Sequence, residues 1–135
     1  MIRYLLDTNA CIELIRKRSP KVLSHLRACP IGSVGLSSVT LAELYFGVAR
    51  SAFPDRNLMA LTQFCAPLEL LPFDDRAASA YGRVRADLER SGFPAGPLDT
   101  LIAAHALSQS AVLVTDNERE FRRVRGLEVE NWDRR

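Results

Sequence analysis

Short apolar runs alternate with helical patterns along this chain, and this alternation limits the possible folds more than any other feature of the sequence. Runs of strand length lie at residues 2–6, 34–36, 68–71, 111–114 and 127–129. Helical patterns, opened or closed by Ser, Pro, Asp or Gly, lie at 11–17, 20–28, 39–50, 58–64, 76–90, 98–108 and 118–124. Such alternation predicts an α/β fold, with a central parallel sheet of about five strands covered by helices on both faces.

The length of 135 residues predicts a single domain over residues 1–135, without an internal repeat or a linker. The stretch from Ser91 to Pro97 is expected to be a loop inside that domain. The apolar run before Asp7 is too short for a signal peptide, and no apolar segment is long enough to span a bilayer. The three cysteines do not form a disulfide framework. We therefore expect a cytoplasmic protein with no membrane contact.

Basic residues form two clusters in a chain whose net charge is only +2. All but two of the 18 basic residues are Arg, whose planar guanidinium binds phosphate in a bidentate manner. The first cluster is residues 16–18 with Lys21, and the second is Arg119, Arg122, Arg123 and Arg125. Both clusters favour a polyanionic partner, although a solvated basic face that aids solubility explains them equally well.

Two acids directly follow strands of the expected sheet. Asp7 comes after the first apolar run, and Asp116 comes after the fourth. In an open parallel sheet, ligands bind beyond the carboxyl ends of the strands, so we expect both acids at one edge. Each acid taken alone is explained equally well as the N-cap of the next helix.

Two further acids lie inside apolar helical segments. Glu43 is surrounded by apolar residues, where an ionised group without a partner would be costly, although a capping box with Thr40 is an alternative. Asp99 follows Pro97, a natural first helical residue, and the alternative explanation is an acid that complements the helix dipole. Together the four carboxylates predict a site for a hard cation such as Mg²⁺ or Mn²⁺.

Several other chemistries lack the residues that they need. The chain has no glycine-rich phosphate loop, no Cys and His spacing that matches zinc, and no nucleophile turn of the G-x-S-x-G kind. Its only lysines are Lys17 and Lys21, whereas enzymes that form an aspartyl phosphate need a late lysine or a second early acid. His25 and His105 lie among leucines in helical patterns, which is typical of structural histidines.

Five segments carry a resemblance to a known family. They are Leu5-Leu6-Asp7-Thr8-Asn9, Ser38-x-Thr40-x-Ala42-Glu43-Leu44-x-x-Gly47, Asp99-x-x-Ile102-Ala103-Ala104-His105-Ala106, Leu113-Val114-Thr115-Asp116-Asn117 with Glu120-Phe121, and Val129-Glu130-Asn131-Trp132. In this order and spacing, over almost the whole chain, they resemble the PIN-domain family and, within it, the VapC toxins.

The resemblance implies a three-layer α/β/α fold and an endoribonuclease that depends on Mg²⁺ or Mn²⁺. Such an enzyme hydrolyses RNA, often transfer RNA, with a metal-activated water and leaves 5′-phosphate and 3′-hydroxyl ends. It also implies a homodimer, a tetramer or larger assembly with a VapB-type antitoxin, and inhibition by that antitoxin. Two alternatives stay open: a structure-specific DNA nuclease, and a binding module that acts mainly in a DNA-bound repressor complex with its antitoxin.

The resemblance also implies roles for particular residues. The acids that match the catalytic set of the family are Asp7, Glu43, Asp99 and Asp116. Asp7 and Asp99 are the expected metal ligands, and Glu120 is the alternative to the fourth acid. Asn9 and Thr115 are expected to hold the carboxylates by hydrogen bonds, as metal sites commonly require.

One segment carries more apolar side chains than a small core needs. We expect it to form a groove or dimer face that takes an antitoxin helix, and the alternative is that all of its members belong to the core. These side chains are Leu44, Tyr45, Phe46, Phe53 and Met59.

Overall fold

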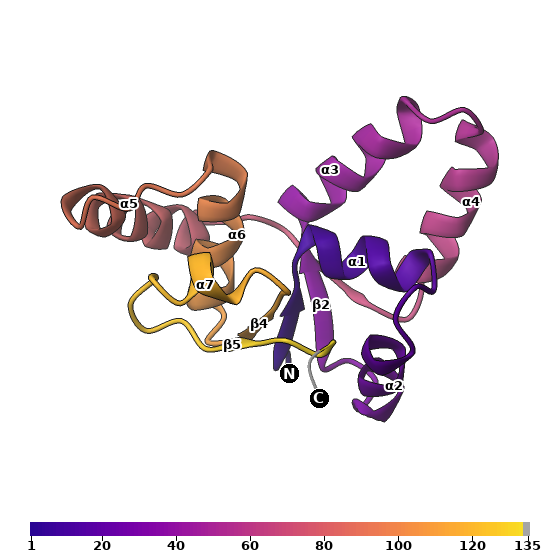
Figure 1. The fold of residues 1–135 in the computed structure, drawn as a ribbon, viewed down its shortest axis with the longest axis horizontal. Helices are drawn as coiled ribbons and strands as arrows, with labels where there is room; N and C mark the ends of the chain where they lie inside the picture. The colour runs from indigo at the N-terminus through magenta and orange to yellow at the C-terminus, as the bar shows by residue number, and fades with distance from the viewer. Residues whose placement is uncertain (134–135) are drawn as a thin grey trace.

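The computed structural model describes residues 1–133, and a five-stranded parallel sheet lies at its centre (Figure 1). The strands are β1 (Tyr4–Leu6), β2 (Val34–Ser37), β3 (Glu69–Leu71), β4 (Val112–Val114) and β5 (Val129–Glu130). Their order across the sheet is β3-β2-β1-β4-β5. The predicted fold class, an α/β domain with a central parallel sheet, is confirmed.

The helices fall where the sequence predicts them, with some shifted ends. They are α1 (Thr8–Ile15), α2 (Pro20–Ala28), α3 (Ser38–Ala49), α4 (Pro54–Cys65), α5 (Asp75–Arg90), α6 (Pro97–Ser108) and α7 (Glu118–Phe121). α1 begins earlier than predicted because the Asp7 side chain accepts a hydrogen bond from the Ala10 backbone N–H and caps the helix. α4 also begins earlier, at Pro54, whose fixed φ suits the first position of a helix.

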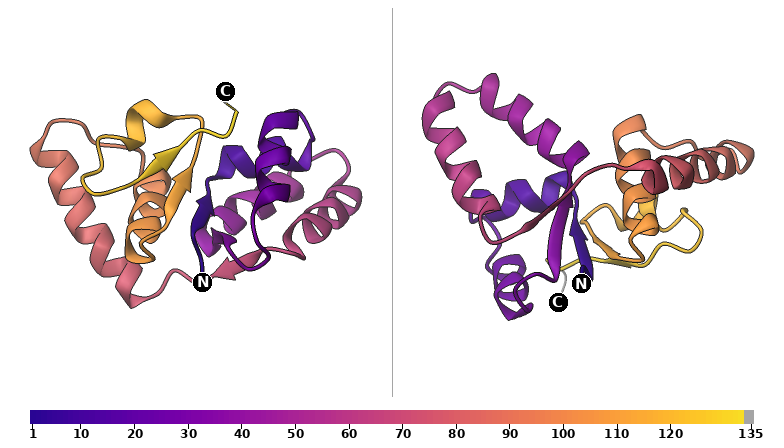
Figure 2. Two further views of the ribbon diagram at one scale, coloured as in Figure 1. Left: turned by 90° about the horizontal axis from the view of Figure 1, so that it is seen from below. Right: turned by 180° about the vertical axis from the view of Figure 1, so that it is seen from behind.

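Two hydrophobic cores lie on opposite faces of the sheet, because neighbouring side chains on a strand point in opposite directions. Leu5 packs with α5 and α6, whereas the next residue, Leu6, packs with α1 to α4. Figure 2 shows the same division, with α5 and α6 on one side of the strands and α1 to α4 on the other. The layers are therefore helix, sheet and helix, as predicted.

The direction in which strands are added changes at β1. The chain adds β2 and β3 on one side of β1, then crosses over through α5 and α6 and adds β4 and β5 on the other side. Clefts that bind ligands form at the carboxyl ends of the strands where this reversal occurs. The fold therefore predicts a ligand site at the ends of β1 and β4.

None of the helices in residues 1–133 has the length and apolar character needed to cross a membrane.

Candidate active site

Asp7 lies directly beyond the end of β1, where the strand order reverses. Its backbone N–H donates to the carbonyl oxygen of Val114 in β4 over 3.0 Å. Its Oδ1 accepts from the Ala10 backbone N–H over 2.8 Å, and the Thr115 side chain also forms a hydrogen bond with its carboxyl group. The residue is only 5% exposed. Asp7 is therefore both the cap of α1 and a buried acid at the sheet edge.

Glu43 comes to this edge from α3. Its Oε1 accepts a hydrogen bond from the Thr8 hydroxyl over 2.6 Å, which ties α3 to the first turn of α1. The alternative capping box with Thr40 is wrong, because Ser37 is the N-cap of α3 and accepts from the Val39 N–H. Glu43 lies in the body of the helix, as predicted.

Asp99 comes from the first turn of α6 and faces Glu120 of α7. Glu120 Oε1 is buried and lacks a hydrogen-bond donor among the described residues, while its Oε2 lies 3.4 Å from the Asn117 amide. The Asp99 and Glu120 carboxyl groups bond to each other only when one of them carries a proton. An unpartnered buried carboxylate oxygen beside a second acid is suited to a cation.

Asp116 is exposed and lies close enough to Asp7 to raise its pKa by repulsion. The structure therefore brings both candidates for the fourth acid to the site, Asp116 near Asp7 and Glu120 against Asp99. The sequence favours Asp116 for its place at the strand end, and that choice stays a prediction.

The electrostatics of the cluster favour positive charge. Burial raises the pKa of Asp7 to about 6, and repulsion from Asp116 and Glu43 adds to the effect. The pKa of Asp99 also rises to about 6, first through burial and then through its hydrogen bond with Glu120 and repulsion from the neighbouring acids. Both pKa shifts mean that the ionised carboxyl groups of Asp7 and Asp99 are destabilised here unless a cation balances their charge.

The donor set suits a hard cation, because every candidate ligand is a carboxylate oxygen. Within residues 1–133, no group of three or more acidic, His or Cys side chains is arranged to hold a metal ion by itself. Mg²⁺ usually keeps several waters and is bound through one or two carboxylates, and Asp7 and Asp99 could supply these.

The supporting hydrogen bonds differ in part from those predicted. Thr115 contacts Asp7, and its hydroxyl also accepts from the Asn117 N–H over 2.9 Å. Asn9 is exposed, and none of the hydrogen bonds found among the described residues joins its side chain to an acid. The neighbouring Thr8 holds Glu43 instead. Asn9 on the first turn of α1 points away because its neighbours Asp7 and Ala10 already face the protein interior.

Both histidines are engaged in packing. His105 is fully buried, its Nδ1 lies 2.7 Å from the Ser37 hydroxyl oxygen, and its ring meets Phe73 edge-on. Burial lowers the pKa of His105. The His25 ring stacks on Trp132 with 5.3 Å between the ring centroids. These contacts fit the prediction of structural histidines.

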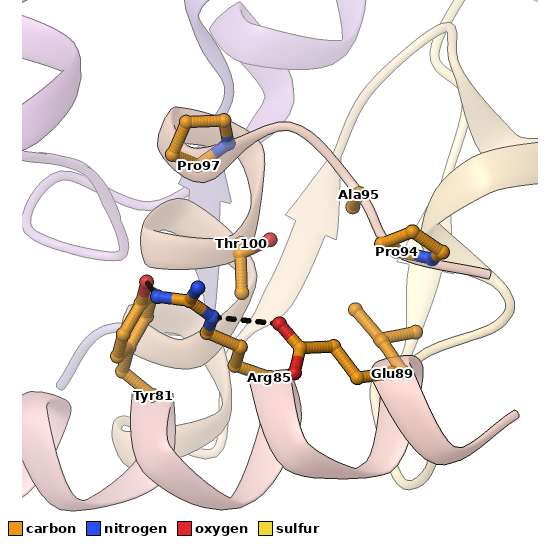
Figure 3. A pocket seen from close by; sticks show the side chains of 8 residues that line it. Tyr81, Arg85, Glu89, Pro94, Ala95, Pro97 and Thr100 are labelled. Carbon is orange, nitrogen blue, oxygen red and sulfur yellow. Dashed lines mark hydrogen bonds and ion pairs between the residues drawn. The ribbon is translucent and has the colours of Figure 1, made fainter. Parts of the chain in front are cut away.

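A separate cavity of about 230 Å³ lies between α5, α6 and the loop that joins them (Figure 3). Arg85 lies across it, bonded to the Tyr81 hydroxyl and to Glu89. Because Glu89 neutralises the guanidinium, the cavity carries little net charge for a ligand. The loop that borders the cavity leads to Asp99.

The model of one family, the PIN domain, matches residues 4–127. The chain is 42% identical over 132 residues to a protein from Shigella flexneri named tRNA(fMet)-specific endonuclease VapC, covering 98% of this chain and 99% of that one. The chain belongs to the PIN-domain family, in its VapC group. A second relative of this PIN domain, ribonuclease VapC2 of Haemophilus influenzae, is 39% identical over 132 residues, with 98% and 99% of the two chains covered.

Solved structures agree with the family. The VapBC2 complex of Rickettsia felis, bound to a DNA fragment from its promoter, matches with a TM-score of 0.92 and 38% identity over 98% of this PIN domain and 100% of that chain. The DNA-bound VapBC complex of Salmonella typhimurium matches with a TM-score of 0.93 and 40% identity over 98% and 99% of the two chains. The resemblance found in the sequence is therefore confirmed.

Proposed function

We propose that this PIN domain is an endoribonuclease toxin that depends on a divalent metal ion, Mg²⁺ or Mn²⁺. The observation that carries the proposal is the meeting of acids from the end of β1 and from α3, α6 and α7 at one sheet edge, where burial and repulsion raise the pKa values of Asp7 and Asp99 to about 6. The relatives named as ribonucleases or as a tRNA(fMet)-specific endonuclease support the choice of RNA.

Asp7 and Asp99 would hold the ion, with Glu43, Asp116 and Glu120 around them. When bound, a divalent ion supplies the positive charge that activates water and stabilises the departing 3′-oxygen. Thr115 holds Asp7, and Thr8 holds Glu43, so these two carboxylates keep fixed directions. Glu43 and Asp116 then orient the attacking water toward the phosphorus. The products are a 5′-phosphate and a 3′-hydroxyl.

Transfer RNA is the first substrate to test, because one relative is named for tRNA(fMet). Initiator and elongator transfer RNAs incubated with the protein and Mg²⁺ would be compared for cleavage. Asp7→Asn should abolish cleavage, whereas Glu13→Gln, which removes an acid further along the same helix, should retain it. Equal cleavage by wild type and Asp7→Asn would contradict the proposal.

A structure-specific DNA nuclease is the alternative reaction, since the metal chemistry does not use the 2′-hydroxyl. Matched RNA and DNA hairpins of one sequence distinguish the two. Cleavage of the RNA hairpin alone is expected.

The partner that we propose is a VapB-type antitoxin seated in a groove of about 400 Å³ between α1, α3 and α4. Ile12, Val48 and Leu61 form apolar walls, and Glu43 also lines the groove, so it leads to the acidic site. The related VapBC complexes of Rickettsia felis and Salmonella typhimurium are bound to DNA, in the first case a fragment of the promoter, which supports an additional role in a DNA-bound repressor complex. A cytoplasmic homodimer, enlarged by the antitoxin, is the assembly that we expect.

The five side chains of the predicted antitoxin face differ in exposure. Leu44 is only 7% exposed and packs in the core, and it also lines the groove. The other four side chains are exposed, by 50% at Tyr45, 64% at Phe46, 57% at Phe53 and 63% at Met59. These four residues, called the apolar face below, lie on α3, at the N-cap of α4 and on α4, the two helices that line the groove together with α1.

A further inference from the structure

Phe93 is an exposed aromatic residue held in a fixed position at the end of α5. Gly92 adopts a φ of +77°, and the Phe93 N–H donates to the Leu88 carbonyl oxygen over 3.0 Å. This is the geometry of a glycine-capped helix end, in which the residue after the glycine usually packs back on the helix. Phe93 instead stays 48% exposed. Its ring is therefore presented to solvent from a rigid backbone.

Arg123 covers one side of this ring. Its guanidinium carbon lies 4.2 Å from the ring centroid, the shortest such contact among the described residues. Arg123 is itself exposed, and so are its cluster neighbours Arg119 and Arg125. An aromatic ring and a guanidinium plane side by side, in a basic surface, are the two groups on which nucleobases stack.

The Phe93 and Arg123 pair lies next to the acids. Asp99 contacts Glu120, and Phe93 contacts Arg123, so the same two segments of the chain, 93–99 and 120–123, are joined twice. The Arg123 N–H donates to the Glu120 carbonyl oxygen over 3.3 Å, which makes residues 120–123 a single helical turn. One such turn advances by roughly 5 Å. Arg123 and Glu120 are therefore one turn apart along the backbone, which places the Phe93 and Arg123 pair beside the acidic cluster. Figure 3 shows the connecting loop, through Pro94 and Ala95, running over α6 to Pro97.

We propose that Phe93, backed by Arg123, is a stacking platform for a nucleobase of the RNA that flanks the scissile phosphate. The inference rests on the proposed function and adds a substrate-binding residue outside the acidic cluster. The exposed aromatics of the apolar face lie on α3 and at the N-cap of α4, in the other helical layer, so the platform is separate from the antitoxin groove. The acids perform the cleavage, and the platform decides which neighbouring base is held.

The test is a binding measurement that does not depend on cleavage. A short single-stranded RNA carrying one 2-aminopurine, placed at successive positions, would be titrated with the full chain bearing Asp7→Asn. Stacking on Phe93 should quench the fluorescence at one position and leave the others unchanged. Adding Phe93→Leu, which keeps the apolar volume, should remove that quenching and weaken binding about tenfold. Phe93→Trp should retain both, because it keeps an aromatic face.

Controls separate charge from stacking. Arg123→Lys keeps the charge and loses the planar group, so it should reduce the quenching more than Arg27→Gln, which removes a charge from α2. In the wild-type background, Phe93→Leu should raise KM for RNA cleavage with little change in kcat.

Three outcomes would overturn the inference. The first is that Phe93→Leu leaves the quenching unchanged, and the second is that its RNA affinity stays within twofold of the Asp7→Asn parent. The third is that Phe93→Leu changes only the sedimentation of the protein, which would assign this face to a second copy of the chain. A wild-type protein that neither binds nor cleaves any RNA would instead overturn the proposed function itself.

Discussion

The buried charge of Asp7 has a measurable cost in the metal-free protein. A carboxyl whose pKa rises from 3.8 unfolded to about 6 folded binds its proton more tightly in the folded state. The contribution of Asp7 to the free energy of unfolding is therefore most favourable below about pH 4 and is lost as the pH rises through about 6. For a pKa shift of this order, the stability lost is about 3 kcal/mol.

Asp7→Asn should raise the melting temperature of the metal-free protein at pH 7.5 and flatten its pH dependence between about 4 and 6. Asn removes the charge and is still a good N-cap, so the bond to the Ala10 N–H is kept. Asp7→Ala also removes the charge but loses the cap, and should melt below Asp7→Asn. Thermal unfolding in chelator across this pH range measures both. A melting temperature of Asp7→Asn well below wild type would show that the residue acts mainly as a cap.

Metal binding should release protons. With the pKa values of Asp7 and Asp99 near 6, an ion that binds their charged forms displaces protons at pH 5.5 to 6 and fewer at pH 8. Calorimetric titration with Mn²⁺ in buffers of different ionisation enthalpy should show weaker binding and more proton release at the lower pH. Asp99→Asn should reduce both effects. Proton release that is the same at both pH values would contradict the assignment.

At the residue scale, sequence reasoning located the acids better than their supports. Asp7 and Asp99 are visible in the sequence because an acid at a strand end or in an apolar helix is unusual. Thr8 was missed, since its hydroxyl reaches Glu43 across 35 positions of sequence and no local pattern encodes that contact. The role expected of Asn9 failed for the same reason, because the choice between adjacent polar residues depends on the rotation of α1.

At the scale of elements, α7 is a single turn that carries Glu120 to Asp99, and it is too short to be stable alone. Glu118 fixes it. The residue is buried, its Oε1 accepts from Arg122 over 2.7 Å and its Oε2 from the Asn131 amide over 3.2 Å. The helix end is thereby tied to the segment that follows β5.

Glu118→Gln should loosen α7 and lower RNA cleavage by displacing Glu120, although Glu118 itself is not among the candidate ligands. Loss of a buried charged hydrogen bond should cost about 1–3 kcal/mol of stability. Glu128→Gln, at an exposed position after the same helix, is the matched control. The Mn²⁺ affinity of both variants gives a second readout, and unchanged affinity in Glu118→Gln would show that α7 is anchored by other contacts.

Helix and strand positions were predictable because each has a local cause. Pro20 and Pro97 begin helices, and apolar runs of a few residues lie between turn residues. The ends were less predictable. The last pattern, 118–124, yields a helix only to Phe121, and the Val124 N–H then donates to the Phe121 carbonyl oxygen in a tighter turn.

At the scale of the whole molecule, the two helical layers are expected to have different tasks. The layer of α5 and α6, with α7, brings Asp99, Glu120 and the stacking platform to the RNA side of the site. The layer of α1 to α4 brings Glu43 and the groove with its apolar face. The sequence predicted an apolar face, but not that Leu44 is buried at the groove while Tyr45 and Phe46 are exposed, because the rotation of α3 is set by core packing.

Binding of the antitoxin should depend on residues of the α1 to α4 layer. Because Glu43 lines the groove, a basic side chain of an antitoxin helix seated there would lie near the acids in place of the metal ion. Met59→Glu should weaken the complex, and Leu70→Glu, at an equally apolar exposed position on β3, should not.

Raising free Mg²⁺ at constant ionic strength should weaken the same complex, since the ion and the basic side chain compete for the same carboxylates. A steeper response to monovalent salt than to Mg²⁺ would point instead to an acidic antitoxin segment on Arg16 and Arg50, which also line the groove. The affinity of the purified pair, measured by titration in each salt, separates the two. Insensitivity to both salts would mean that the antitoxin blocks the site by its bulk alone.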